Sequence, residues 1–421
     1  MLATDRSRFA AIVALALAVR ACWAIAVPVV PLSDSNVYDV LARNIASGVG
    51  YAFEPGKPSA YWPVGTSAVY AGLYRVFGVG YAPILVLNVL VGGLTVALVM
   101  TLAGRWYGPR AGRYAGLVLA LWPGQVMFSS ILASELLFNL GWLAALYFFG
   151  RKDWPAALRV PLVAAVLAGT SFVRPLALPM PVIFAWFCLA GSLRKPPWSW
   201  RSLLGIGAEA GITLALMLAM LAPWAERNRR GLGEAVLVST NGGANLWMGN
   251  NPNTNGGYCP LPPEVESLNE AVRDRLLKNE AIAYIKARPL AFVGRTAKKA
   301  VQTYDRETIG VTWNEEGLTR RYGAFVLMPL KAICTAYWWG MLALGGIGMI
   351  CVWKRSGFWG WISDPAIVLW FYFGALHAVI VSGDRYHYPS TPLIAALAGL
   401  ALATWKDRRP GNTTDLRDIP V

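Results

Sequence analysis

The chain has 421 residues, of which 56% are hydrophobic and only 14% are charged. Soluble domains carry about 25% charged residues, so this composition excludes an ordinary soluble protein. The formal net charge is +15, but the basic residues cluster in short segments between apolar runs. We therefore interpret the charge as a signal of membrane orientation and expect no nucleic-acid partner.

Apolar segments of membrane-spanning length recur along the chain, since a helix needs about 20 apolar residues to cross a bilayer. We expect an all-α polytopic membrane protein of about ten spans, at 9–30, 82–104, 114–131, 133–150, 156–173, 177–191, 203–223, 324–352, 363–381 and 388–405. The chain then divides into an N-terminal transmembrane module (1–222), a polar cap (223–322) and C-terminal transmembrane helices with a short tail (323–421).

The first span begins like a signal peptide, with Arg6 and Arg8 ahead of an apolar run. No small-residue cleavage site follows, so we interpret it as an uncleaved span that contains Cys22 as a buried thiol. Five cysteines and two histidines are spread along the chain without metal-ligand spacing. We therefore expect no disulfide framework and no histidine-rich metal centre.

Lys and Arg residues predict the orientation of the spans, because they are enriched in loops that stay in the cytoplasm. The candidate cytoplasmic residues are Arg6, Arg8, Arg105, Arg110, Arg113, Arg151, Lys152, Arg159, Arg194, Lys195, Arg201, Lys354, Arg355, Lys406, Arg408 and Arg409. An even number of spans places both termini on this side. The first loop (31–81), the cap (223–322) and the loop 382–388 then face the opposite side.

The first loop opens with Ser33–Asn36, and an amphipathic stretch to Gly50 predicts a helix lying on the membrane surface. A second interfacial or re-entrant helix is expected over 62–77. The Asp34 carboxylate is costly near lipid, which favours a role in chemistry or ion pairing. The alternative is a helix N-cap whose carboxylate accepts backbone N–H bonds. Asp39 lies on the polar face of the helix, and we interpret it as solvated.

Other polar residues are expected on the same side of the membrane. Lys57 lies close to the aromatic turn Tyr61–Pro63, where it is a phosphate-binding candidate or a snorkelling lysine in an aromatic belt. Glu135 lies at the end of a predicted span, as a second active-site carboxylate or as a helix cap. Arg174 follows the span 156–173 and adds a cation.

The cap begins with the Gly/Asn-rich segment 241–258, which we interpret as a loop. Its backbone and side-chain amides suit sugar hydroxyls or phosphate, and the alternative is a set of tight turns. The segment 264–301 has helical spacing of apolar residues. Further along, the polar loop 382–388 brings Arg385, Tyr386 and His387 directly before the last span.

Several of these motifs occur in the same order as in the GT-C glycosyltransferases. The chain resembles in particular the bacterial relatives of protein O-mannosyltransferases and of lipid A aminoarabinose transferases. The motifs that carry the resemblance are Ser33–Tyr38, Tyr61–Gly65, Ser134–Phe138, Arg227–Asn228, Asn241–Pro252 and Arg385–Tyr386 ahead of Pro389. The similarity covers most of the chain. It departs at Ser35 and Val37, where many relatives carry an acid and an arginine.

The resemblance implies an inverting transfer of a sugar from a polyprenyl-phosphate donor on the periplasmic face of a bacterial inner membrane. It implies that Asp34 is the catalytic base, with Glu135 as a second acidic candidate. The candidate cations for the donor phosphate are Lys57, Arg174, Arg227 and Arg385. Donor or acceptor contacts are expected from Tyr61, Trp62, Asn241, Asn245, Asn250, Asn251, Tyr386 and His387.

No metal cofactor is required by this chemistry, because the leaving group is already an anion. The shortness of the chain favours a membrane lipid or a periplasmic glycan as acceptor over a protein. Two alternatives from other classes are a transporter or flippase of lipid-linked sugars and a non-catalytic subunit of a glycan assembly complex. Few ionisable residues lie deep inside the spans, namely Arg20, Glu209 and Lys331, whereas coupled transporters bury such groups at mid-membrane.

Overall fold

A computed structural model describes residues 3–193 and 199–407, and the fold over these residues is almost entirely helical. The helices of the bundle are α1 (Ala3–Ala26), α4 (Ala82–Tyr107), α5 (Pro109–Ala120), α7 (Glu135–Phe149), α8 (Ala156–Val173), α9 (Met180–Leu193), α10 (Trp200–Leu232), α17 (Leu327–Ser363), α18 (Pro365–Val379) and α19 (Thr391–Asp407). The other helices are α2 (Asp34–Ala46), α3 (Val64–Phe77), α6 (Pro123–Met127), α11 (Gly242–Gly249), α12 (Pro263–Glu266), α13 (Glu270–Ala287), α14 (Pro289–Tyr304), α15 (Ile309–Thr312) and α16 (Glu315–Tyr322). The all-α polytopic fold that the composition predicts is therefore confirmed.

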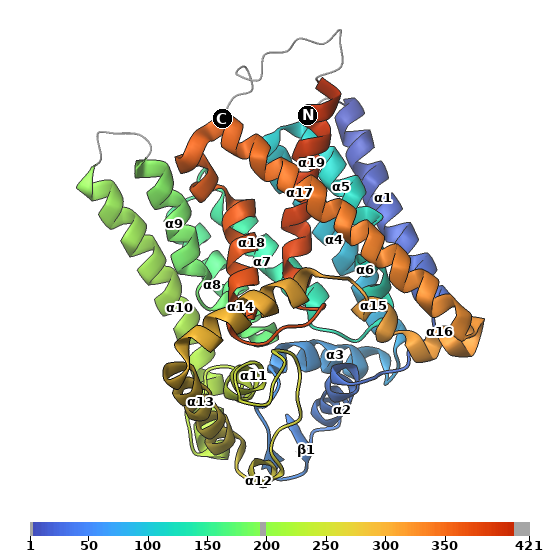
Figure 1. Ribbon diagram of the computed structural model, residues 1–421, viewed down its shortest axis with the longest axis vertical. Helices are drawn as coiled ribbons and strands as arrows, with labels where there is room; N and C mark the ends of the chain where they lie inside the picture. The colour runs from blue at the N-terminus through green and yellow to red at the C-terminus, as the bar shows by residue number, and fades with distance from the viewer. Residues whose placement is uncertain (1–2, 194–198, 408–421) are drawn as a thin grey trace.

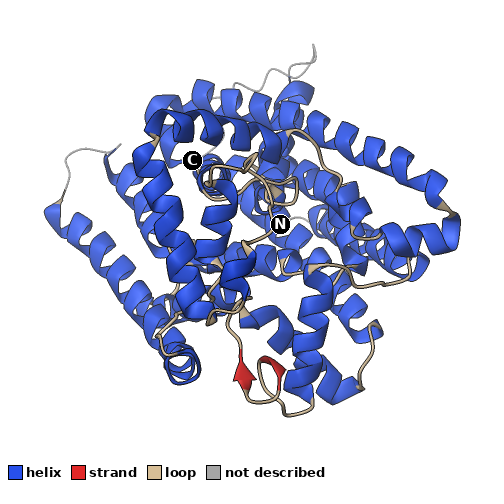
Figure 2. Cartoon of the chain, turned by 60° about the horizontal axis from the view of Figure 1, so that its bottom comes forward, coloured by secondary structure: helices blue, strands red, loops and turns tan. Residues whose placement is uncertain are grey.

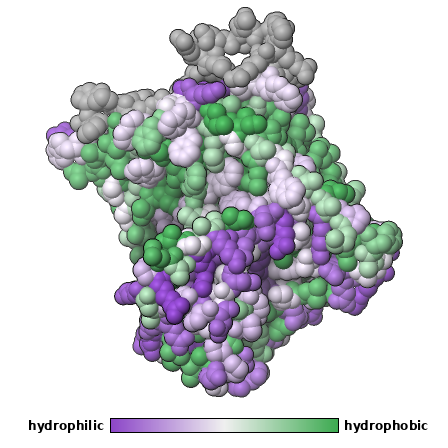
Figure 3. Space-filling view, viewed as in Figure 1, coloured by the Kyte–Doolittle hydropathy of each residue, from purple (hydrophilic) through white to green (hydrophobic). Residues whose placement is uncertain are grey.

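The bundle and the polar segments occupy opposite ends of the molecule (Figure 1). The start of α1 and the end of α19 lie at one end of the bundle, whereas the first loop and the helices α11, α12 and α13 lie at the other. In the described residues the only sheet is a hairpin in the first loop, where β1 (Ala52–Glu54) pairs with β2 (Lys57–Pro58) (Figure 2). Hydrophobic residues gather over the bundle and hydrophilic residues over the end that holds the cap (Figure 3).

The described residues contain six helices long and apolar enough to cross a membrane. The segments Pro123–Ser130 and Glu135–Phe149, which are bent by 117° at their junction, would together make a seventh. Each of the ten expected spans contains a helix, but several of these helices are shorter than the expected span. The number of spans therefore stays a prediction. The candidate cytoplasmic residues Arg194, Lys195, Arg408 and Arg409 lie outside the described residues.

The expected continuous span over 114–131 is wrong, because α5 ends at Ala120 and the chain then turns into α6. Pro123 opens α6, and a proline disfavours helical backbone in the residue before it. The side chain of Arg20, which is 1% exposed, reaches across from α1 to the end of α5. Its guanidinium donates to the carbonyl oxygens of Leu119 (3.1 Å) and Ala120 (3.1 Å). This buried arginine therefore satisfies carbonyl groups that the helix end leaves free.

Close helix contacts at the centre of the bundle fix the helix that carries the last polar loop. A Cβ atom at Gly399 of α19 would lie 2.4 Å from the backbone oxygen of Ala111 in α5. A Cβ atom at Gly348 of α17 would lie 2.3 Å from the backbone oxygen of Leu397 in α19. Small residues let membrane helices approach this closely. The packing holds α19, and with it the preceding loop 382–388, against the rest of the bundle.

The cap differs from its expected form in two places. The segment 242–249 forms helix α11, so the interpretation of 241–258 as a loop is wrong over these residues. Its Gly residues allow close packing, since a Cβ at Gly249 would lie 1.8 Å from the Ile380 oxygen. The expected helical segment 264–301 is divided into α12, α13 and α14, with Pro289 opening the last of them. In the bundle, Cys22 is exposed, so its interpretation as a buried thiol is also wrong.

Candidate functional site

Asp34 is the first residue of α2, and the backbone before it is strained. Ser33 has a φ of 51°, and no other non-glycine residue of the described chain has a positive φ. This region is disfavoured for side chains larger than glycine, and such strain is often concentrated at functional sites. Ser33 occupies the N-cap position without a side-chain cap bond. The alternative interpretation of Asp34 as the N-cap is therefore wrong, and its carboxylate is available for another partner.

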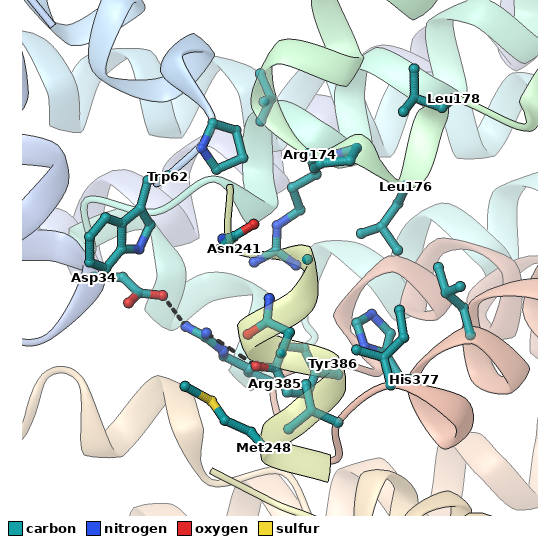
Figure 4. Close-up of a pocket in the computed structure, with 18 of the residues that line it drawn as sticks. Asp34, Trp62, Arg174, Leu176, Leu178, Asn241, Met248, His377, Arg385 and Tyr386 are labelled. Atoms are coloured by element: carbon teal, nitrogen blue, oxygen red, sulfur yellow. Dashed lines mark hydrogen bonds and ion pairs between the residues drawn. The ribbon is translucent and has the colours of Figure 1, made fainter. Parts of the chain in front are cut away.

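That partner is Arg385, from the loop that precedes α19 (Figure 4). Arg385 Nη1 donates to Asp34 Oδ2 at 2.5 Å, and the two side chains are 22% and 20% exposed. The guanidinium also lies over the rings of Trp313 (5.1 Å) and Tyr386 (5.0 Å). The two aromatic rings therefore hold the guanidinium in place, while both charged side chains remain partly exposed to solvent.

A second ion pair lies beside the first. Arg174 ends α8 in extended backbone, as expected for a residue before a proline. Its guanidinium donates to Ser134 Oγ at 2.8 Å and forms a short ion pair with Glu135. Glu135 is 1% exposed, whereas Arg174 is 11% exposed. The carboxylate of Glu135 thus lies behind Arg174, and Arg174 presents its charge toward the cavity.

Asp34, Arg385 and Arg174 line a cavity of about 520 Å³ between the first loop, α11, the connection from α8 to α9 and the end of α18. Asp34, Trp62, Arg174 and Arg385 lie close together in it, and the apolar side chains of Leu176 and Leu178 lie on the opposite side of Arg174 (Figure 4). The further lining residues are Tyr38, Tyr61, Pro63, Val173, Pro175, Pro179, Asn241, Gly242, Asn245, Met248, Tyr258, Tyr372, Leu376, His377, Ile380, Val381 and Tyr386. The cavity therefore combines charged groups with an apolar wall.

The aromatic turn of the first loop is fixed to the cap by a carboxylate from α13. Glu270 accepts hydrogen bonds from Ser59 Oγ (2.8 Å) and from the backbone N–H of Ala60 (2.8 Å). The Arg273 guanidinium lies 5.0 Å from the centre of the Tyr61 ring, which in turn packs edge-on against Trp62. These contacts place Tyr61 and Trp62 in the cavity wall.

Two of the predicted phosphate-binding cations lie outside the cavity. Arg227 donates to the backbone oxygens of Ser59 (2.6 Å) and Tyr51 (2.7 Å), so its charge anchors the first loop to the end of α10. Lys57 lies in the hairpin, where its 77% exposed side chain pairs with Glu54 at 2.6 Å. The prediction that they line the donor site with Arg174 and Arg385 is wrong in position, because Arg227 is engaged by carbonyl groups of the first loop and Lys57 lies in the exposed hairpin.

Asn250, Asn251 and His387 are also absent from the cavity lining. Asn250 Nδ2 donates to the backbone oxygen of Val379 (2.9 Å), and the buried Lys299 donates to Asn250 Oδ1 (3.1 Å), which joins α11 to the end of α18. Asn251 Nδ2 donates to the Trp247 oxygen at 3.0 Å. His387, 1% exposed, contacts the Thr303 oxygen through Nδ1 at 2.7 Å. Their polar groups are occupied by the protein itself.

Asp39 is buried, with 5% exposure, so its interpretation as a solvated residue is wrong. Its carboxylate accepts hydrogen bonds from Arg43 Nε (3.0 Å), Tyr74 Oη (2.5 Å) and Tyr81 Oη (3.0 Å). The amphipathic pattern of α2 does not reveal this, because the phenol groups come from α3 and from the residue before α4. Asp39 therefore joins the two interfacial helices of the first loop.

Tyr38 and His377 line the cavity although the sequence did not single them out as site residues. Tyr38 lies one helical turn after Asp34, so its place beside Asp34 follows from helix periodicity. His377 lies within an apolar span. The one feature of the sequence that could have indicated it as a site residue is that the chain has only two histidines. Tyr38 ends the motif Ser33–Tyr38, whereas His377 lies outside every motif that the sequence offered.

Comparisons with solved structures were made on this fold. The Archaeoglobus fulgidus oligosaccharyltransferase in complex with Zn and sulfate superposes with a TM-score of 0.56 at 13% identity, over 94% of this chain and 49% of that chain. ArnT from Cupriavidus metallidurans bound to undecaprenyl phosphate gives a TM-score of 0.50 at 17% identity, over 96% of this chain and 61% of that chain. The chain has the GT-C fold. The resemblance inferred from the sequence motifs is thereby confirmed at the level of the fold.

The chain spans about half the length of the oligosaccharyltransferase and about three fifths of ArnT. No protein-family model matches the sequence, and a search of curated proteins finds no match either. At these low identities the fold alone is shared.

The two carboxylates nearest the cavity both have a cationic partner in this structure. Asp34 pairs with Arg385 and Glu135 pairs with Arg174. Over residues 3–193 and 199–407, no group of three or more His, Cys, Asp or Glu side chains is placed to hold one ion. The expectation that no metal is required stays a prediction.

The electrostatics of the GT-C site favour the ionised form of Asp34. Burial alone would raise the pKa of this carboxyl group. The charge and hydrogen bond of Arg385, the charge of Arg174 and a hydrogen bond from Trp62 more than offset burial and hold the pKa below its usual range. Burial lowers the pKa of Arg385, but the charge of Asp34 more than offsets burial and raises this pKa above its usual value. In the ligand-free site both groups are therefore charged.

Proposed function

We propose that the chain is an inverting glycosyltransferase that moves a sugar from a polyprenyl-phosphate donor to a lipid or glycan acceptor. The observation that carries this proposal is the convergence of Asp34, Arg174 and Arg385 in one cavity with an apolar wall. A carboxylate base, two fixed cations and a path for a lipid chain are the three requirements of that reaction.

The two arginines bind the donor phosphate. Guanidinium groups form paired hydrogen bonds to phosphate oxygens, and a site shielded from water strengthens the attraction. The apolar wall that includes Leu176, Leu178 and Leu376 receives the first isoprene units of the lipid. The sugar then lies toward Trp62 and Asn241, whose ring and amide suit its apolar face and its hydroxyl groups.

The transfer is a single displacement at the anomeric carbon. The acceptor hydroxyl or amine attacks this carbon, and Asp34 takes the proton that the acceptor loses. The bond between the anomeric carbon and the phosphate oxygen breaks, and both electrons leave with the polyprenyl phosphate. Arg174 and Arg385 stabilise the charge that develops on this leaving group. Attack from the side opposite to the leaving group inverts the configuration.

Donor binding also prepares the base. In the ligand-free site Arg385 pairs with Asp34, which keeps its pKa low and makes it a weak base. A donor phosphate shares Arg385 and so weakens this pairing, while the burial that raises the pKa remains. The basicity of Asp34 therefore increases when the donor is bound.

We propose that the reaction takes place on the periplasmic face of a bacterial inner membrane. Helices α2 and α11, which contribute to the cavity lining, lie at the end of the molecule opposite to the start of α1 and the end of α19 (Figure 1), and the short segments between spans on that opposite side are rich in Lys and Arg. Positive residues stay in the cytoplasm, so the cavity faces the periplasm and both termini face the cytoplasm. The acceptor is a membrane lipid or a periplasmic glycan. The sugar, either a hexose or a pentose, is identified by the experiment.

The experiment uses purified protein in lipid and a panel of radiolabelled polyprenyl-phosphate sugars with membrane lipid extract as acceptor. We expect wild type to release polyprenyl phosphate and Asp34→Asn to bind the donor but turn over at least about 100-fold more slowly. The control is Lys57→Met, an exposed charge outside the cavity, which should match wild type.

Other outcomes of the same experiment distinguish the alternative functions. Donor binding without release in wild type points to a non-catalytic subunit. Absence of binding to every lipid-linked sugar contradicts the glycosyltransferase. Movement of the labelled lipid between leaflets without release identifies a flippase.

A further inference from the structure

Helix α14, within the segment expected to form the cap, exposes an apolar face. Its exposed residues are Pro289, Leu290, Ala291, Val293, Gly294, Ala297, Lys298 and Val301. The large apolar side chains among them are Leu290, Val293 and Val301, which are 87%, 63% and 68% exposed. Together with Ala297 they follow the helical repeat, since residues three or four positions apart share a face. Such a stripe is unfavourable in water, because apolar surface gains free energy only when it is removed from water.

The inward face of α14 holds the cations. Arg295 Nη1 donates to the backbone oxygen of Asn251 at 2.8 Å. Lys299 is 0% exposed, and its ammonium donates to the backbone oxygen of Val379 in α18 at 2.7 Å. A helix on the surface of a soluble domain has the opposite arrangement, with its apolar stripe toward the core. Polar groups inside and apolar groups outside are typical of protein segments that contact lipid.

The preceding helix, α13, has the polarity expected in water. Its exposed charged residues are Arg275, Lys278, Glu280 and Lys286, whereas the residues it buries are Ala271, Leu277 and Ala281. Within α14, the one charged residue that is exposed is Lys298. The two helices follow one another in the chain, so the change of polarity between them indicates a change of surroundings.

The far end of α14 is attached to a helix of membrane-spanning length. Trp338 Nε1 donates to the Tyr304 oxygen at 2.9 Å, and Trp339 Nε1 donates to the Asp305 oxygen at 2.9 Å. Both indoles belong to α17, which is part of the apolar helical segment Ala324–Ser363. The Trp339 ring is 58% exposed while its N–H is bonded, as is common for tryptophan at the membrane boundary. The exposed face of α14 therefore continues the lipid-facing surface of the bundle, which it crosses where the cap begins (Figure 1).

We propose that α14 is a membrane-docking helix that lies in the leaflet on the side of the cavity, with its apolar face against phospholipid acyl chains. Lys298 extends from this face to the head-group phosphates. Lys299 also contacts the backbone oxygen of Ile380, a residue of the cavity lining, at 3.3 Å. The wall of the cavity is thus attached to a helix at the depth of the lipid head groups. This contact with lipid does not depend on which reaction the cavity catalyses.

The test uses the full chain in nanodiscs of phosphatidylethanolamine and phosphatidylglycerol. The five native cysteines are replaced by alanine, and the fluorophore NBD is attached to Val293→Cys or Val301→Cys on α14, or to Lys278→Cys on α13. We expect phospholipids with a nitroxide in the upper acyl chain to quench both α14 labels, and iodide in the buffer to leave them bright. The Lys278→Cys label should show the reverse, with its emission at longer wavelength.

A second measurement keeps the native cysteines. Val293→Glu introduces a charge at a position that we assign to lipid, and it should lower the thermal midpoint of the protein in nanodiscs. In water the same change would favour the helix slightly, because glutamate has a higher helix propensity than valine. The matched control is Val272→Glu, at an exposed position of α13, which should leave the midpoint as in wild type.

Two results with the labelled variants would overturn the proposal. Quenching of the α14 labels by iodide and not by lipid nitroxides would mean that water covers this face. Protection from both quenchers would mean that protein covers it. A midpoint of Val293→Glu that equals wild type would likewise exclude a lipid contact at this position.

Discussion

Asp34 and Arg385 are 351 positions apart in the chain, yet their charged groups meet at 2.5 Å. The contact is prearranged by the core, because the loop of Arg385 is fixed on both sides. Asp384 accepts hydrogen bonds from the N–H (2.9 Å) and the hydroxyl (2.6 Å) of Thr308, and His387 contacts the Thr303 oxygen. Site residues that are held by such secondary contacts keep the geometry that catalysis requires.

Replacement of Arg385 tests whether this pair belongs to the donor site. We expect Arg385→Met to lower kcat/KM for a lipid-linked sugar by about 100-fold to 1000-fold, as for loss of a group that stabilises developing charge. Arg385→Lys should recover only part, because an ammonium cannot form the paired contacts of a guanidinium. The measurement is donor turnover beside Lys57→Met as control. Equal losses in Arg385→Met and Lys57→Met would contradict the assignment.

The pH dependence tests whether the donor activates Asp34. A base must be ionised, so activity falls as pH falls through its pKa. In the free protein that pKa lies below its usual value of about 3.9, and kcat/KM should show no loss from Asp34 down to about pH 4. In the donor complex Arg385 is shared between Asp34 and the donor phosphate, so the pKa of Asp34 should be higher than in the free protein. As the pH is lowered, kcat should therefore begin to fall at a higher pH than kcat/KM. Steady-state kinetics between pH 4 and 8 should therefore show an acid limb in kcat and none from Asp34 in kcat/KM, and the same pH dependence in both would argue against this coupling.

The buried pair of Glu135 and Arg174 predicts a stability effect. Glu135→Gln leaves Arg174, which is 11% exposed, without its counter-charge. Breaking a buried pair from one side costs about 3–5 kcal/mol, so the thermal midpoint should fall clearly. The double variant Glu135→Leu with Arg174→Met should be more stable than Glu135→Gln, but inactive with the donor. A midpoint for Glu135→Gln that equals wild type would show that the pair is unimportant for folding.

Asp39 predicts how firmly the first loop is held. An Asn at this position has only one acceptor oxygen for Arg43, Tyr74 and Tyr81, so Asp39→Asn should cost about 1–3 kcal/mol locally. Limited proteolysis in the segment 47–59 should become faster, and donor turnover should fall because Asp34 shares the helix. The matched control is Asp305→Asn, whose side chain is 40% exposed. Equal rates of proteolysis in both variants would mean that the hydrogen bonds of Asp39 do not hold the first loop in place.

The corrected site residues show where local patterns stop being informative. Lys57 and Arg227 have the positive charge that phosphate binding requires. The direction of each side chain depends on the partner that the fold gives it, which is the backbone of the first loop for Arg227 and Glu54 for Lys57. Asp39 was interpreted as solvated, but two of its three partners, Tyr74 and Tyr81, lie outside its own helix. Asn250 and Asn251 looked like ligand-binding amides, but carbonyl groups at the ends of α11 and α18 use them. The partners of Arg227, Asp39 and Asn250 are far away in the sequence, whereas the contacts of Lys57 with Glu54 and of Asn251 with Trp247 are local.

By itself the sequence determined the class of protein, the helical segments, the polar end of the bundle and the candidates Asp34, Arg174 and Arg385. Apolar runs, charge asymmetry and motif order are local properties, and they are sufficient for this much. Only the tertiary structure decided that Asp34 pairs with Arg385, that Glu135 lies behind Arg174, and that His377 enters the cavity while His387 does not. The physical reason is that these relations depend on how distant helices pack, because a side chain acquires its partners only when burial excludes water and brings those helices together.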